Sequence, residues 1–147
     1  MSKDTLPIMR GWFGGCPFCS ITTHQGRIIQ SRSKQSILAE VREMASDSRF
    51  TGTVSDIGGP TANMYQMKCT KPEVEAICRR QSCVDPTICK LLGTDHDPLI
   101  EVMAGARQTP GVKKVLVASV NANAKGYSNL LCHTGITDRH WTFSQHT

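Results

Sequence analysis

The sequence of 147 residues is poor in aromatic side chains, which make up 5% of it, and it has no long apolar run. No stretch approaches the roughly 18–20 apolar residues that a helix needs to cross a bilayer. The N-terminal segment MSKDTLPIMRG also lacks an apolar core of signal-peptide length. These absences predict a cytoplasmic protein that has no membrane partner and is not exported.

The sequence also lacks a concentrated block of charge of either sign. The formal net charge is +5, but the basic residues are scattered or occur in pairs such as Arg79-Arg80 and Lys113-Lys114. Binding along a phosphate backbone needs clustered positive charge. We therefore interpret these residues as solvated surface and expect no nucleic-acid partner. A hydrophobic content of 39% and a charged content of 20% indicate one folded globular domain.

Cysteine, in contrast, is plentiful, with seven residues in the chain. An odd number of cysteines without an export signal argues against a disulfide framework. Such thiols either bind metal or fill small positions in a core. Cys16 and Cys19 lie in the segment RGWFGGCPFCSIT, where closely spaced glycines let the backbone wrap around a group that is not protein.

The apolar pattern predicts alternating strands and helices. SRSKQSILAEVREMAS is typical of a helix with Ser33 as its N-cap. DHDPLIEVMAGARQTPG is typical of a second helix with Asp97 as its N-cap and Pro98 in its first turn. Strands are expected near TLPIMRG, over about 51–57 and in VKKVLVAS. This order favours an α/β fold of about three parallel strands with crossover helices.

An insertion over about 62–96 interrupts this alternation, and KPEVEAICRR and DPTICKLL within it predict two short helices. It carries four cysteines, Cys69, Cys78, Cys83 and Cys89. Their spacing is looser than the paired Cys-x-x-Cys of a zinc ribbon. They could hold a zinc ion, hold an iron–sulfur cluster, or pack as inert thiols. A non-catalytic module with a structural metal at these four residues is therefore an alternative function. In residues 120–147 the apolar residues follow neither the helical nor the strand period for long, which predicts a divergent, poorly ordered tail.

From about Ile8 to Ser119 the chain resembles the YgiQ-type radical S-adenosylmethionine (radical SAM) proteins. The blocks that carry the resemblance are FGGCPFCSIT, GRIIQSRS, SDIGGPTANMYQMKC, CRRQSCVDPTICKLLGTDHDPLI and GVKKVLVAS. The resemblance implies that residues 1–119 form a partial radical SAM (βα) barrel. It also implies reductive cleavage of S-adenosylmethionine to a 5′-deoxyadenosyl radical at a 4Fe-4S cluster.

The site residues that the resemblance implies fall in two places. Cys16 and Cys19 match the second and third cysteines of the cluster motif Cys-x-x-x-Cys-x-x-Cys, and Phe18 matches its aromatic position. Gly58, Gly59 and Pro60 match the glycine motif that contacts the methionine amino group of the cofactor. The implied cofactors are a 4Fe-4S cluster and S-adenosylmethionine, which is also the implied small-molecule partner.

Trp12 stands where the first cluster cysteine is expected, and an indole nitrogen only donates hydrogen bonds. Two protein thiolates predict an incomplete cluster. The resemblance also ends after Ser119, which predicts an incomplete barrel whose remainder another chain could supply. We therefore expect impaired activity, and an inactive remnant is a further interpretation.

Other polar side chains receive weaker assignments. His24 is interpreted as a solvated loop residue and His96 as part of a helix start. Asp56 precedes the glycine pair, where it could contact a ligand or serve as a structural carboxylate. No role is assigned to the tail residues Cys132, His133, His140 and His146.

Overall fold

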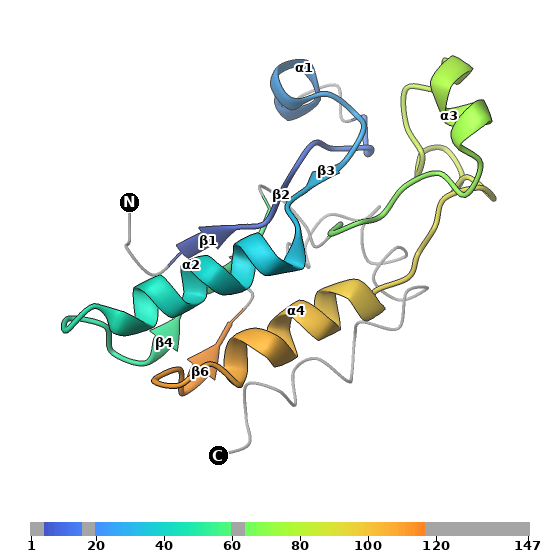
Figure 1. Ribbon diagram of the computed structural model, residues 1–147. Helices are drawn as coiled ribbons and strands as arrows, with labels where there is room; N and C mark the ends of the chain where they lie inside the picture. The colour runs from blue at the N-terminus through green and yellow to red at the C-terminus, as the bar shows by residue number, and fades with distance from the viewer. Residues whose placement is uncertain (1–4, 16–19, 60–63, 117–147) are drawn as a thin grey trace.

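The computed structural model describes residues 5–15, 20–59 and 64–116 (Figure 1). The elements are β1 (Thr5–Pro7), β2 (Met9–Arg10), α1 (Ile21–Gln25), β3 (Gln30–Ser31), α2 (Lys34–Ser46), β4 (Thr53–Val54), β5 (Asp56–Gly58), α3 (Pro72–Ile77), α4 (Asp97–Arg107) and β6 (Lys114–Val115). The expected tail over 120–147 lies outside the described residues, as do Cys16, Cys19 and Pro60. Within the described ranges, no helix combines the length and apolar character needed to cross a membrane.

The segment 53–58 lies between two parallel neighbours. β5 pairs with β1, with Ile57 opposite Leu6, and β4 pairs with β6, with Val54 opposite Val115. The Ile57 amide also donates to the Leu116 carbonyl at 2.9 Å, so the pairing continues past the break between β4 and β5. β2 and β3 form a separate antiparallel pair. The described residues thus form a mixed α/β arrangement with small parallel sheets and no closed barrel.

The helices α2 and α4 pack side by side next to these strands (Figure 1). Ile37 and Val41 of α2 are fully buried, as is Val102 of α4. A Cβ atom added at Gly105 would lie 3.0 Å from the Leu38 side chain, which shows how closely the two helices approach. The core between the helices and the strands fixes the positions of the ends of the strands and of the loops that follow them.

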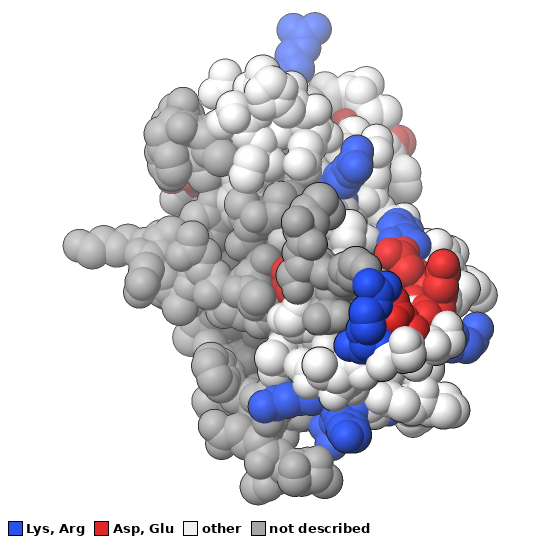
Figure 2. Space-filling view, turned by 90° about the vertical axis from the view of Figure 1, so that its left-hand side faces the viewer, with Lys and Arg blue, Asp and Glu red and all other residues white. Residues whose placement is uncertain are grey.

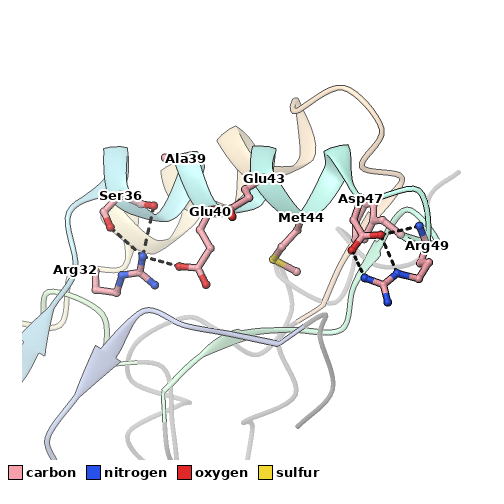
Figure 3. A pocket seen from close by; sticks show the side chains of 9 residues that line it. Arg32, Ser36, Ala39, Glu40, Glu43, Met44, Asp47 and Arg49 are labelled. Carbon is pink, nitrogen blue, oxygen red and sulfur yellow. Dashed lines mark hydrogen bonds and ion pairs between the residues drawn. The ribbon is translucent and has the colours of Figure 1, made fainter.

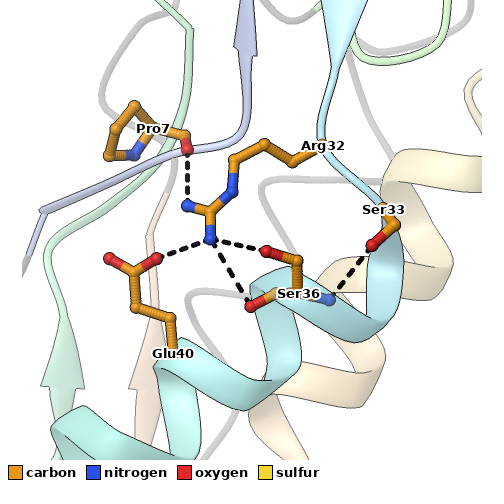
Figure 4. A network of polar contacts seen from close by, with 5 residues as sticks. All are labelled: Pro7, Arg32, Ser33, Ser36 and Glu40. Carbon is orange, nitrogen blue, oxygen red and sulfur yellow. Dashed lines mark hydrogen bonds and ion pairs between the residues drawn. The ribbon is translucent and has the colours of Figure 1, made fainter.

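The start of α2 follows the sequence prediction. The Ser33 hydroxyl accepts a hydrogen bond from the Ser36 amide at 3.2 Å, as an N-cap residue does. Next to it, the Arg32 guanidinium donates to the Pro7 carbonyl at 3.2 Å and pairs with the Glu40 carboxylate at 2.7 Å (Figure 4). Arg32 therefore links the end of β1 to the first turns of α2.

The insertion is less regular than the sequence predicts. The first of its two expected helices is present as α3. The prediction of a second helix over DPTICKLL is wrong, because this segment forms bends and turns. The Ser82 hydroxyl accepts from the amides of Val84 and Asp85, and the Cys89 amide donates to the Cys83 carbonyl. In a helix the Cys89 amide would donate to the Asp85 carbonyl four residues earlier, so its bond to Cys83 shows that the helical ladder is not formed here.

Charged side chains are spread over the described surface. On the face in Figure 2, separate Lys and Arg side chains surround a group of acidic ones. A shallow groove of about 730 Å³ along α2 is lined by such residues (Figure 3). Its cations are already paired within the groove, Arg32 with Glu40 and Arg49 with Asp47 at 2.8 Å. The groove therefore does not point to a ligand, and it contains none of the residues singled out from the sequence.

Candidate functional site

The glycine-rich loop that follows β2 is pressed against the chain that leads into β3. Gly11 has a φ of +102°, and a Cβ atom there would lie 2.4 Å from the Ile28 carbonyl oxygen. The next amide, of Trp12, donates to the Gly26 carbonyl at 3.0 Å. Only glycine satisfies both the backbone angle and the close approach at position 11.

Trp12 belongs to the hydrophobic core. Its side chain is 3% exposed, and its ring stacks with that of Phe13 at a centroid distance of 6.2 Å. A Cβ atom on Gly14 would lie 2.5 Å from the indole ring, so the ring folds back over this glycine. The position of the first expected cluster ligand is thus filled by a packed apolar ring without a metal-binding atom.

The two cysteines of the loop, Cys16 and Cys19, lie outside the described residues, but what precedes and follows them is visible. Gly15 has a φ of +62°, and a Cβ atom there would lie 2.3 Å from the Gln81 carbonyl oxygen. The loop therefore enters this segment while packed against the insertion. On the other side, His24 is exposed as expected, but its placement in a loop is wrong, because it lies in α1.

The glycine pair lies at the carboxyl end of β5, where ligands of parallel sheets commonly bind. Gly58 is buried, pairs with Pro7, and accepts a hydrogen bond from the Ile8 amide at 2.9 Å. A Cβ atom on Gly59 would lie 2.3 Å from the end of the Met9 side chain. The close approach at Gly59 is therefore to Met9, shortly before the glycine-rich loop that follows β2. Asp56 is half-buried in the same strand, opposite Thr5.

The four cysteines of the insertion lie around one cavity. Cys69, Cys78, Cys83 and Cys89 are all free thiols and half-buried. All four line a single cavity of about 50 Å³, together with apolar side chains such as Phe13 and Leu92. Among the side chains that the structure describes, no three Cys, His, Asp or Glu residues already lie in an arrangement that could hold a metal ion.

Arg27 joins the insertion to the loop region. Its guanidinium donates to the carbonyl of Cys78 at 2.5 Å and to the carbonyl of Arg80 at 2.6 Å. One of its nitrogens also lies 3.7 Å from the Cys78 sulfur. The single cationic side chain thus holds the turn after α3 in place.

The thiols of the cavity differ in acidity. A hydrogen bond from the Arg80 backbone, with a second from the Arg27 guanidinium, lowers the pKa of Cys78. Burial raises the pKa of Cys83, and the neighbouring Cys89 and Cys78 act in the same direction. Of these two thiols, Cys78 therefore becomes a thiolate more readily.

His96 lies at the end of the insertion and is 7% exposed. Its carbonyl accepts hydrogen bonds from the amides of Leu99 and Ile100, both at 3.0 Å. The interpretation of His96 as part of a helix start is confirmed, since it is the N-cap residue of α4. The prediction of Asp97 as the cap is wrong, because Asp97 is already the first residue of the helix.

Known proteins share most of this chain. Over 120 residues, which are 81% of the chain, it is 59% identical to a UPF0313 protein of Pseudomonas putida. Over the same share it is 58% identical to UPF0313 proteins of Vibrio vulnificus and Bradyrhizobium diazoefficiens. The chain is homologous to the UPF0313 proteins. UPF0313 denotes the YgiQ-type family, so this part of the resemblance is confirmed. No protein-family model matches the chain.

The match covers a small part of each relative. The matched segment is 16% of the Pseudomonas putida protein and 18% of the Bradyrhizobium diazoefficiens protein. The chain therefore spans about a sixth of the length of the curated UPF0313 relatives that it matches.

One residue of the site in this UPF0313 homologue had no signal in the sequence. Arg27 contacts Cys78 across 51 positions, and no spacing rule connects the two. Arg27 lies in GRIIQSRS, a segment that resembles the YgiQ-type proteins, and this marks the segment but not the arginine. The four cysteines, in contrast, stood out by their number in one short insertion, where zinc, a cluster and inert packing were all open interpretations.

Proposed function

We propose that the chain is the cluster-loop part of a radical SAM core whose capacity to generate a radical is impaired. Homology to UPF0313 proteins over 81% of the chain supports the lineage. The position of Gly58 and Gly59 at the carboxyl end of a parallel strand, beside the loop after β2, supports a cofactor site there. In this proposal, Gly58, Gly59 and Pro60 hold the methionine end of S-adenosylmethionine.

The observation that carries the impairment is the packing of Trp12. Its indole is buried against Phe13 and Gly14, at the position where the first cluster cysteine is expected. The residues present therefore do not fit a fully ligated 4Fe-4S cluster, because only Cys16 and Cys19 remain as thiolates in the motif. A site of two protein thiolates leaves iron exchangeable with solvent.

The test compares two variants of equal size reduction. After anaerobic reconstitution with iron and sulfide, we expect Trp12→Cys to retain clearly more iron and acid-labile sulfide than the unchanged chain. Trp12→Ser is the matched control, because it loses the same buried ring, about 3–5 kcal/mol of stability, without gaining a thiolate. Equal iron contents in the two variants would contradict the assignment of position 12.

The unchanged chain is tested for turnover in the same series. Under a strong reductant with S-adenosylmethionine, we expect no accumulation of 5′-deoxyadenosine. Sustained formation of that product by the unchanged chain would overturn the proposed impairment, while leaving the lineage intact. Binding of S-adenosylmethionine is measured separately by equilibrium dialysis, and its absence would contradict the cofactor site at the glycine pair.

A further inference from the structure

The insertion is closed at its base by pairing between its two ends. Cys69 and Leu92 form an isolated antiparallel bridge, and the Thr70 amide donates to the Leu91 carbonyl at 2.7 Å. The Gly93 amide donates to the Lys68 carbonyl at 2.9 Å. The segment 69–92 is therefore a closed loop, and all four of its cysteines line the cavity between it and the segments that contain Phe13 and Arg27.

This closed loop has little apolar packing of its own. Beyond α3, a helix of six residues, it consists of turns and bends. Ile77 of α3 is 79% exposed, and Val84 and Leu92 are only partly buried against the main core. Small irregular segments of this kind commonly depend on a disulfide or a metal ion for stability. The four cysteines are free, so a disulfide does not supply that support here.

We propose that Cys69, Cys78, Cys83 and Cys89 together bind one Zn²⁺ ion that stabilises the insertion. Four sulfur ligands complete the tetrahedral coordination of a structural zinc site. The cavity of about 50 Å³ has room for a few water molecules, since one needs roughly 10–15 Å³ of such space, so it also admits a single ion. The four thiols favour zinc, because they match its preferred set of ligands.

Binding requires the four side chains to close around the ion. Within the described part of the chain they line one cavity without yet forming a ligating group. Each thiol loses its proton to solvent when it becomes a ligand, and no electron is transferred. The resulting site carries excess negative charge, and Arg27, which already contacts Cys78, is the cation that offsets it.

The ion would also hold the insertion against the cluster loop. The Cys83 amide donates to the Phe13 carbonyl at 2.9 Å, and Gly15 approaches Gln81 too closely for any side chain at position 15. A ligand at position 83 is thus bonded directly to the loop. The zinc site is independent of S-adenosylmethionine binding, so either proposal can fail without the other.

The first experiment measures metal in the protein purified under reducing conditions without chelator. We expect about one zinc per chain by elemental analysis, and at least a tenfold lower content in Cys83→Ser and in Cys89→Ser. Cys132→Ser is the matched control, since it removes a thiol outside the proposed ligands, and it should keep the zinc. The double variant Cys16→Ser/Cys19→Ser should keep it as well.

The second experiment does not depend on the folding of a variant. The metal-free, reduced chain is titrated with Co²⁺, which reports thiolate ligation through intense sulfur-to-metal charge-transfer absorption. We expect saturation at about one Co²⁺ per chain and displacement by Zn²⁺. Absence of these bands would overturn the proposal, and so would zinc that survives Cys83→Ser. Iron with acid-labile sulfide that is lost in Cys83→Ser would also overturn it, in favour of a cluster.

Discussion

At the scale of single residues, the loop after β2 is shaped by positions where only one type of side chain fits. Gly11 and Gly15 both have positive φ, and at both a Cβ atom would meet a backbone carbonyl. Trp12 fills the space above Gly14 and closes the core on this side. The two glycines thus leave space for neighbouring backbone, whereas Trp12 fills space with its ring.

Gly11→Ala tests this close approach. The added Cβ would lie 2.4 Å from the Ile28 carbonyl oxygen, which as backbone cannot rotate away. Gly26→Ala is the control, because Gly26 also has a positive φ, of +79°, but nothing lies within 4 Å of its added Cβ. We expect Gly11→Ala to lose about 1–3 kcal/mol more than Gly26→Ala in urea unfolding. Equal losses would mean that backbone strain alone accounts for the glycine at position 11.

At the scale of elements, the helices show what local pattern can predict. The N-cap Ser33 and the apolar spacing of Ile37 and Val41 predicted α2, and the structure confirms both. The helix expected over DPTICKLL did not form, and the Cys89 amide donates to the Cys83 carbonyl instead of the Asp85 carbonyl that a helix would supply. A local hydrogen bond of this kind is not visible in an apolar pattern.

The contact between the insertion and the loop region was beyond such patterns. It rests on Arg27, on the Cys83 amide and on the fit of Gly15, which come from segments far apart in the sequence. The sequence marked the four cysteines by their number but not the cation beside them. A contact that one arginine makes with a distant segment produces no periodic pattern in the sequence.

Arg27→Lys tests this attachment. Lysine keeps the charge but cannot reach the carbonyls of Cys78 and Arg80 with a planar fork, so we expect a loss of about 1–2 kcal/mol. A loss of this size corresponds to roughly a tenfold change in the opening of the insertion. The readout is the rate at which the Cys83 thiol of the metal-free protein is alkylated.

Arg42→Lys is the control, because it is the same substitution at an exposed position of α2. We expect it to leave the alkylation rate of Cys83 unchanged. A similar acceleration in both variants would show that Arg27 does not hold the insertion in place.

At the scale of the whole molecule, the described chain divides into a well-packed part and a weakly packed one. Val54, Ile57 and Val102 are fully buried where the strands meet α2 and α4. The insertion is held instead by a few hydrogen bonds at its base and by Arg27. The homology to UPF0313 proteins covers 81% of the chain. Within the chain, the core and the insertion nevertheless differ in how much buried apolar surface stabilises them.

Amide hydrogen exchange would measure this difference. The amides of Ile57 and Leu116 lie in the parallel pairing, so we expect them to exchange only when the whole core unfolds, with a strong dependence on denaturant. The amides of Thr70 and Cys89 have hydrogen bonds of similar length, both 2.7 Å, but little buried apolar surface around them. We expect these to exchange through local opening, which exposes little surface and depends weakly on denaturant.

Removal of metal sharpens the same measurement. If zinc stabilises the insertion, a chelator should speed exchange at Thr70 and Cys89 and leave Ile57 and Leu116 unchanged, because the core hydrogen bonds do not involve the four thiols. The ratio between the two pairs of amides serves as an internal control, since chelation affects both in one sample. Equal exchange free energies and equal denaturant dependence at all four amides would show that insertion and core unfold as one cooperative unit.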